Sequence, residues 1–174
     1  MASPLLDDPR LTAVGLFIEA HLGLTARLAP RFAEYGLSDT EVEVLLRLAR
    51  TPGGRLRMTD LSAQTSLSTS GITRVVDRLE RTGLTTRVSC ETDRRGTWAQ
   101  ITDSGMERIV AVLGPHLDDV EKWFTGRLTA GQLDALTEAL RIIRDAVHPD
   151  AVAGAADAAK TAADNAAAGA AAIS

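Results

Sequence analysis

The segment of residues 68–84, STSGITRVVDRLERTGL, joins an aliphatic stripe to a face of hydroxyl and guanidinium groups. Its apolar side chains recur at steps of three, four and seven residues, which is the period of one helix face. The opposite face carries Ser70, Arg74, Asp77 and Arg81. Hydroxyls and the N–H groups at a helix start suit phosphate contacts, and an arginine can bind guanine O6 and N7 together. The segment therefore predicts a helix that packs on one side and contacts nucleic acid on the other.

Asp77 is the member of this outer face that does not suit nucleic acid, because phosphates repel a carboxylate. It lies three residues after Arg74 and four residues before Arg81. Side chains at these spacings are neighbours on a helix surface. We therefore expect Asp77 to hold one of these two arginines in place.

Beyond this helix the period of the sequence changes from 3.6 to 2, which indicates strands. Residues 84–90 and 97–101 alternate in polarity, and the segment between them, ETDRRG, is polar and ends in glycine. These features predict a two-stranded β-hairpin with Arg94 and Arg95 at its tip. Arginines at such a tip would reach a minor groove or the DNA backbone.

Helical patterns occupy most of the remaining chain. An apolar stretch over residues 9–36 predicts a long first helix that Pro30 should kink or interrupt. Ser38 and Thr129 each begin a capping box that opens a further helix. A short helix precedes residues 68–84, and a long helix follows the hairpin. The result is a mainly α fold, a winged helix-turn-helix with about six helices and a two-stranded wing, whose second helix of the pair lies in the major groove.

Charge is distributed unevenly along the chain. The protein of 174 residues has a net charge of −4, which by itself does not suggest binding to nucleic acid. Residues 55–96, however, contain eight arginines and five acidic residues, a local charge of +3, so the remainder carries −7. A basic module within an acidic frame is expected of a protein that meets a polyanion on one face. Double-stranded DNA is therefore the expected partner.

The helix and the hairpin together resemble the MarR family of transcription regulators. The family pattern is a helix of the form TR-x-x-D-x-L-E-x-x-G-L and a wing of the form D-x-R followed by L-T-x-x-G, with isoleucine here in place of that second leucine. The matching residues are Thr73, Arg74, Asp77, Leu79, Glu80, Gly83, Leu84, Asp93, Arg95, Ile101, Thr102 and Gly105. The resemblance implies an obligate homodimer in which the first and last helices of both chains intertwine. It also implies that the two winged lobes bind a palindrome and that Arg95 enters the minor groove.

Trp98 departs from the family pattern, since many relatives carry a charged or small residue at this position. Two interpretations of Trp98 are open. In the first, the indole stacks on Arg87 across the hairpin. In the second, the indole lies against the sugar backbone of the nucleic acid.

Three regions follow from these patterns. Residues 1–37 and 103–148 form a helical dimerisation region, and residues 38–102 form the winged helix-turn-helix lobe. Residues 149–174 form an alanine-rich tail that is disordered or a frayed helix. Both terminal helices carry more apolar residues than one small lobe can cover, which independently predicts a homodimer.

The expected function is that of a DNA-binding transcription regulator, a ligand-responsive repressor that binds an inverted-repeat operator as a homodimer. The residues expected to contact DNA are Ser68, Thr69, Ser70, Thr73, Arg74, Arg78, Arg81, Arg94 and Arg95. One alternative is a winged helix used only for protein contacts, although such a module would not need these arginines. A second alternative is an oxidant sensor that uses Cys90, the single cysteine, for which the competing role is that of a small buried hydrophobe.

Members of the MarR family commonly respond to phenolic ligands, oxidants or metals. His21, Arg27 and Arg31 on the first helix are candidates for lining an effector pocket, and the competing interpretation, which we favour, places them in solvent or in ion pairs between helices.

The three histidines are far apart in sequence, so no metal site and no cofactor is expected. No catalytic or phosphate-cradling motif of the common enzyme families occurs, so an enzyme is not expected. The start of the chain is unlike a signal peptide and no run of 18 apolar residues occurs, which predicts a cytoplasmic protein without a membrane partner.

Overall fold

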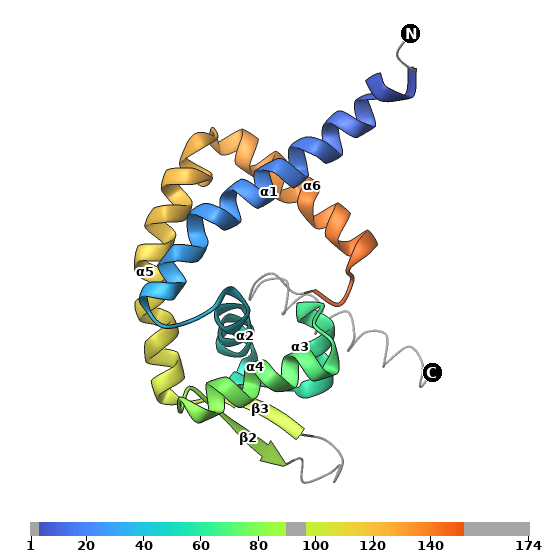
Figure 1. Cartoon of the computed structure of the whole chain (residues 1–174). Helices are drawn as coiled ribbons and strands as arrows, with labels where there is room; N and C mark the ends of the chain where they lie inside the picture. Colours follow the sequence, from blue (N-terminus) through green and yellow to red (C-terminus); the bar gives the residue numbers. More distant parts are fainter. Residues whose placement is uncertain (1–3, 90–96, 152–174) are drawn as a thin grey trace, which may run out of the picture.

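Figure 1 shows the computed structural model, which describes residues 4–89 and 97–151. The described residues form a mainly helical fold with a three-stranded antiparallel sheet, and the predicted winged helix-turn-helix is confirmed. The helices are α1 (Pro9–Glu34), α2 (Asp39–Arg50), α3 (Met58–Thr65), α4 (Thr69–Arg81), α5 (Asp103–Trp123) and α6 (Ala130–Val147), with 3₁₀ turns η1 (Pro4–Asp7), η2 (Pro52–Gly54) and η3 (Thr125–Arg127). The strands are β1 (Arg55–Arg57), β2 (Thr85–Ser89) and β3 (Thr97–Ile101). Cys90, Arg94, Arg95 and nearly all of the alanine-rich tail lie outside the described residues.

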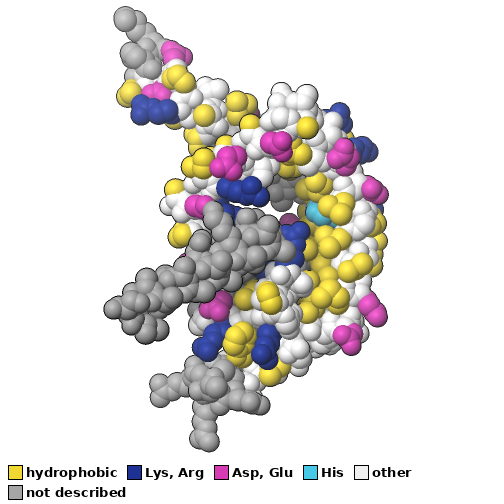
Figure 2. Space-filling view, turned by 180° about the vertical axis from the view of Figure 1, so that it is seen from behind, with side chains coloured by type: hydrophobic (Ala, Val, Ile, Leu, Met, Phe, Trp, Pro, Cys, Tyr) yellow, Lys and Arg dark blue, Asp and Glu magenta, His cyan; other side chains and the backbone are white. Residues whose placement is uncertain are grey.

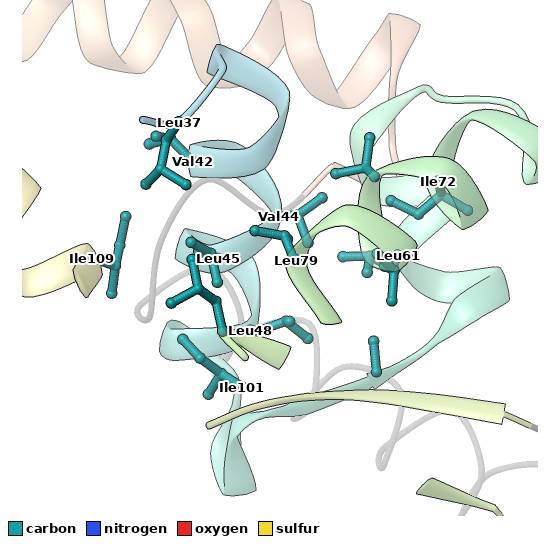
Figure 3. Packing of buried hydrophobic residues seen from close by; sticks show 14 of the residues in the cluster. Leu37, Val42, Val44, Leu45, Leu48, Leu61, Ile72, Leu79, Ile101 and Ile109 are labelled. Atoms are coloured by element: carbon teal, nitrogen blue, oxygen red, sulfur yellow. The ribbon is translucent and has the colours of Figure 1, made fainter. Parts of the chain in front are cut away.

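An apolar core between α2, α3, α4, α5 and the sheet holds the lobe together, and Figure 3 shows its side chains. Ile72 and Leu79 of α4 lie in it with Leu61 of α3 and Val44 of α2, and all four are fully buried. Burying an aliphatic side chain of this size contributes about 1.5–3 kcal/mol. Helix α4 is therefore fixed through one stripe, which leaves its other face available for binding.

Side-chain caps set where the helices begin. Ser38 and Thr129 form the two predicted capping boxes, and in each the residue three positions later bonds back to the N–H of the cap. Ser68 caps α4, because its Oγ accepts a hydrogen bond from the N–H of Gly71 at 3.1 Å. Each such cap contributes about 1 kcal/mol. The predicted helix starts at Ser38 and Thr129 are confirmed.

The sheet has the strand order β1-β3-β2, and both pairings are antiparallel. Strands β2 and β3 form the predicted hairpin. The two-stranded wing is thus confirmed, and β1 adds a third strand to its sheet that was not predicted. The sequence does not indicate it, because its three residues between a Pro-Gly-Gly turn and the start of α3 are too few to show a period of two.

Helix α5 approaches the start of the wing very closely. Gly105 in its first turn is buried, and a Cβ at this position would overlap the carbonyl oxygen of Leu84. The Oγ1 of Thr102 donates to the carbonyl oxygen of Gly83 at 2.7 Å and accepts from the N–H of Gly105 at 3.0 Å. Gly83 has a φ of +74°, in the left-handed region that favours glycine. These residues join the end of α4, the wing and α5.

Two prolines lie inside long helices. Helix α1 continues as one helix from Pro9 to Glu34 through Pro30, so the predicted interruption does not occur. Helix α5 contains Pro115 and curves along its length in Figure 1. A proline removes one N–H from the helix ladder and crowds the preceding turn, and curvature without a break accommodates both effects.

Helix α1 extends away from the lobe, whereas α6 runs back toward α3 (Figure 1), where Nε2 of its C-cap His148 lies 2.8 Å from the carbonyl oxygen of Ala63. Helix α6 has no buried residue, and in α1 the one buried residue is Phe32. Their exposed large hydrophobic residues are Leu11, Val14, Leu16, Phe17, Ile18 and Leu22 on α1, and Ile142, Ile143 and Val147 on α6. Among the described helices, α1 is the one whose length and apolar composition would also suit a membrane span. Both helices thus present apolar faces that the described chain leaves uncovered.

Candidate nucleic-acid interface

Helix α4 presents two chemically different faces. Ile72, Val75, Val76 and Leu79 are all buried, so the predicted apolar stripe is confirmed. The predicted contact residues lie on the remaining surface: Ser68, Thr69, Ser70, Arg74, Arg78 and Arg81 are exposed, and Thr73 is half-buried. The start of α4 therefore offers hydroxyl groups to solvent beside the N–H groups of its first turn.

The three arginines of α4 are held differently. Arg74 is exposed and makes no hydrogen bond or ion pair with the residues that the structure describes. Arg81 donates from Nε to the carbonyl oxygen of Asp77 at 3.2 Å, along the helix. The Nε of Arg78 lies 3.1 Å from Oε1 of Glu41, in an ion pair that ties α4 to the start of α2. Arg74 is thus the arginine of this helix whose N–H groups are all available to a ligand.

The carboxylates of α4 bind an arginine from the wing. Arg87 of β2 places Nη2 2.6 Å from Oδ1 of Asp77 and Nη1 2.5 Å from Oε2 of Glu80. The backbone N–H of Arg87 also donates to Oε1 of Glu80, at 3.0 Å. The prediction that Asp77 holds the side chain of Arg74 or Arg81 is therefore wrong. Helix spacing does not reveal the true partner, because the chain turns after α4 and returns along it as β2.

We call this group of Arg87, Asp77 and Glu80 the Arg87 clamp. The side chain of Asp77 is 46% exposed and that of Glu80 is 37% exposed, so both carboxylates lie near solvent. Pairing with one guanidinium lowers their combined charge from −2 to −1. Charge-assisted bonds of this kind are also short and directional. The clamp therefore reduces the negative charge on α4 and holds the wing at a fixed place along the helix.

Trp98 of β3 contacts the two arginines of β1. The Cζ atoms of Arg55 and Arg57 lie 5.2 Å and 5.4 Å from the centroid of the indole. Arg87 pairs with Ala99 across the strands and lies on the other face of the sheet, so the predicted stacking of Trp98 on Arg87 is wrong. Contact with a sugar backbone stays a prediction. Sequence reasoning misses these partners because β1 itself gives no signal.

The candidate effector residues Arg27 and Arg31 both contact α5. The Cζ of Arg27 lies 4.6 Å from the ring centroid of Trp123, and Nε of Arg31 lies 2.8 Å from Oδ2 of Asp119. The hydrogen bond between Arg31 and Asp119 lowers the pKa of the Asp119 carboxyl and raises the pKa of Arg31. His21, by contrast, is exposed on α1. Arg31 is therefore engaged in an ion pair between helices, and Arg27 in a cation–π contact.

His116 of α5 is a feature of this junction that the sequence does not indicate. Its ring centroid lies 4.8 Å from that of Phe32, and its Nδ1 is buried without a hydrogen-bond partner in the described part of the chain. Burial lowers the pKa of His116, and Arg31 lowers it further, while Asp119 acts in the opposite direction. Only the packing of α1 on α5 brings these groups together. The described residues contain no cluster of three or more histidine, cysteine or acidic side chains that could hold a metal ion.

Comparison with known proteins assigns this architecture to a family. A family model described as MarR family matches residues 35–96. AbsC, a MarR family transcriptional regulator from Streptomyces coelicolor, is 31% identical, and the match covers 80% of this chain and 95% of AbsC with a TM-score of 0.75. Sco3205, a MarR family transcriptional regulator from the same organism solved in complex with DNA, is 32% identical, with 79% and 87% covered and a TM-score of 0.74. The chain belongs to the MarR family.

A further relative in sequence is the HTH-type transcriptional regulator MhqR of Bacillus subtilis. It is 28% identical over 122 residues, which are 70% of this chain and 82% of MhqR. These MarR-type relatives are transcriptional regulators, not enzymes. The chain is accordingly a DNA-binding transcription regulator.

The structure gives physical reasons for several residues of the MarR pattern. Asp77 and Glu80 hold the wing through Arg87. Gly83 lets the chain leave α4 with a positive φ, and Gly105 leaves room for a backbone carbonyl. These pattern residues are explained by contacts within the lobe, whereas Arg74 of the same pattern has no such contact among the described residues.

Proposed function

We propose that the protein is a homodimer that inserts α4 of each lobe into the major groove of an inverted-repeat operator and represses transcription there. The state of Arg74 is the observation that carries this proposal. It lies one turn after Ser70, near the start of α4, where recognition helices contact base edges. Its guanidinium is exposed and unpaired among the described residues, while the neighbouring carboxylates of α4 are bound by Arg87.

The regions of the chain have separate roles in this proposal. Residues 38–102 form the DNA-binding lobe, and residues 1–37 and 103–148 form the dimerisation region. Hydroxyl and N–H groups at the start of α4 bind phosphates and position the helix. Arg94 and Arg95, which lie outside the described residues, are proposed to reach the flanking minor groove. The protein acts in the cytoplasm, where its operator is.

The uncovered helices support the homodimer. On α1, Leu16, Phe17 and Leu22 are 61%, 53% and 61% exposed. Monomeric soluble proteins rarely leave contiguous apolar surface of this extent in water. A second copy related by a two-fold axis would bury the same faces of both chains. Two lobes related in this way require an inverted repeat with half-sites about one helical turn, roughly 10 bp, apart.

Selection of binding sites from a random duplex library tests this proposal directly. We expect the selected pool to contain an inverted repeat, and light scattering to give twice the chain mass of 18.4 kDa. Replacing Arg74 with alanine should lower affinity for the selected site. A monomeric mass, or a pool without inverted symmetry, would contradict the proposed mode of binding.

We place the proposed effector response at the junction of α1 and α5. Phe32 supplies an aromatic ring there, and the unpartnered Nδ1 of His116 supplies a polar group that gains a hydrogen bond from a ligand. A phenolic ligand, one of the effector classes that the family resemblance implies, carries both an aromatic ring and a polar group. Salicylate should release the wild-type protein from its operator and act less strongly on His116→Leu. An operator affinity that millimolar salicylate leaves unchanged argues against this site.

The two alternative functions predict different outcomes. A module for protein contacts alone would select no duplex from the library, and Arg74→Ala would leave it unaffected. An oxidant sensor that uses Cys90 would lose DNA binding after peroxide treatment, and Cys90→Ser would prevent that loss. Cys90 lies outside the described residues, so this alternative rests on the sequence alone.

A further inference from the structure

The outer face of the wing sheet is a basic surface that the proposed function leaves without a role. The strand register places six described side chains on this face, namely Arg55, Arg57, Thr86, Val88, Trp98 and Gln100. None of these six is acidic, and the two arginines give them a combined charge of +2. Figure 2 shows Lys and Arg side chains on either side of a hydrophobic patch at the lower end of the molecule.

Trp98 organises the two arginines of this face. Both guanidinium groups lie over one indole, at 5.2 Å and 5.4 Å from its centroid. A cation–π contact at an exposed site contributes about 0.5–1 kcal/mol. It also restricts long side chains before any ligand binds, which lowers the entropy lost on binding. Arg55 and Arg57 are thus held side by side, with Arg55 exposed to solvent.

The two faces of the sheet use their arginines differently. Arg87 on the inner face is paired with carboxylates of α4. The outer face has no carboxylate among its six described strand residues with which Arg55 could pair. Arg55 therefore adds to the positive potential around the wing, and an anionic partner fits this face better than an apolar one.

We propose that Arg55, Arg57 and Trp98 bind the sugar-phosphate backbone of DNA that flanks the operator half-site, beyond the segment that α4 contacts. This inference rests on the proposed function. The face is continuous with the proposed interface, because Trp98 belongs to the hairpin whose tip is expected in the minor groove. Guanidinium groups bind phosphate oxygens with paired hydrogen bonds, and the indole offers an apolar surface to deoxyribose. Each winged lobe thereby extends its contact along the duplex.

Two duplexes that carry the same selected operator test the inference. The short duplex ends at the outer edge of the half-sites, and the long duplex adds ten base pairs of unrelated sequence at each end. The dissociation constants of wild type and Arg55→Ala are measured on both by fluorescence anisotropy, between 50 and 200 mM salt.

A contact to one phosphate changes affinity about 3.5-fold over this fourfold salt range. We expect Arg55→Ala to lower the salt slope on the long duplex by about 2 per dimer, one contact from each protomer. On the short duplex its affinity should stay within about twofold of wild type, because the lost phosphates are absent there.

Arg10→Ala is the matched control, because it removes an exposed arginine at the start of α1, far from the lobe in Figure 1. It should bind both duplexes as the wild type does. Trp98→Phe keeps an aromatic ring on the sheet and should reduce the preference for the long duplex less than Arg55→Ala does. If Arg55→Ala keeps the wild-type ratio of long to short affinity, the inference is overturned and the face is left to an acidic protein partner. If the wild type binds neither duplex, the proposed function is wrong, and this inference, which rests on it, is wrong as well.

Discussion

Replacing Arg87 with alanine should weaken DNA binding more than it weakens the fold. The side chain of Arg87 is 28% exposed, and both of its carboxylate partners are more exposed still. Ion pairs in such positions contribute about 0.2–1 kcal/mol each. Loss of the two pairs should therefore lower the free energy of unfolding by about 1 kcal/mol, which corresponds to about 2–4 °C in Tm for a chain of this length.

The effect on DNA comes from the charge that the substitution exposes. Without Arg87, Asp77 and Glu80 leave −2 on α4 in place of −1. A unit charge that lies 8 Å from a phosphate is repelled by about 0.5 kcal/mol at a dielectric constant of 80 and about 2 kcal/mol at 20. Operator affinity should therefore fall by about 2- to 30-fold. The deficit should shrink at high salt, because mobile ions screen the repulsion.

The assay measures operator affinity at 50 and 200 mM salt for a set of matched variants. Arg87→Ala combined with Asp77→Asn restores the charge of −1 and should regain most of the affinity without regaining Tm. Arg108→Ala is the control, because this exposed arginine donates to the carbonyl oxygen of Tyr35 and its loss frees no carboxylate. If the double variant binds as weakly as Arg87→Ala, or if Arg87→Ala binds as the wild type does, the electrostatic argument is refuted.

Three further results are expected. Arg74→Ala should cost about 1–3 kcal/mol on the selected operator and much less on a scrambled duplex, and equal losses would make Arg74 a phosphate contact. Gly105→Ala should lower the free energy of unfolding by about 1–3 kcal/mol or more, because its Cβ overlaps the carbonyl oxygen of Leu84, and an unchanged Tm would contradict that approach. Burial lowers the pKa of His116 from 6.5, so below pH 6.5 the unfolded chain binds more protons than the folded chain, and the free energy of unfolding falls as the pH drops. Denaturation at pH 7 and pH 5 should show a smaller loss for His116→Leu than for wild type, and equal losses would remove His116 as the cause.

Local patterns predict the parts of this fold whose physical causes are local. The stripe of α4 follows from the helix period, and the starts at Ser38, Ser68 and Thr129 follow from hydrogen bonds within four residues. The hairpin follows from a change of period over two segments long enough to display it. In each case the residues that determine the structure are neighbours in sequence, so the sequence alone is sufficient to predict it.

The parts that sequence reasoning misses depend on contacts between elements. Asp77 has arginines at helical spacing on its own helix, but it pairs with Arg87, which the wing brings back to α4. One interpretation of the sequence stacks Trp98 on Arg87 across the hairpin, but its partners Arg55 and Arg57 come from a strand that precedes α3. His116 meets Phe32 only because α1 packs on α5. The spacing of residues within one helix or strand shows which neighbours on that element could pair. It does not show whether a residue from another element binds in their place.

The arginines of the lobe show why net charge is a poor guide to whether a protein binds DNA. Arg78 and Arg87 are paired with acidic side chains of the lobe, so they remove repulsion without presenting much positive charge. Arg74 and Arg81 on α4 and Arg55 on the outer sheet face are exposed and have no acidic partner among the described residues, so we expect an approaching phosphate or base to meet their charge. An acidic protein can therefore bind a polyanion when its wing neutralises the carboxylates of its recognition helix. It follows that substitutions in β2, which carries none of the proposed base contacts, should change how α4 binds DNA.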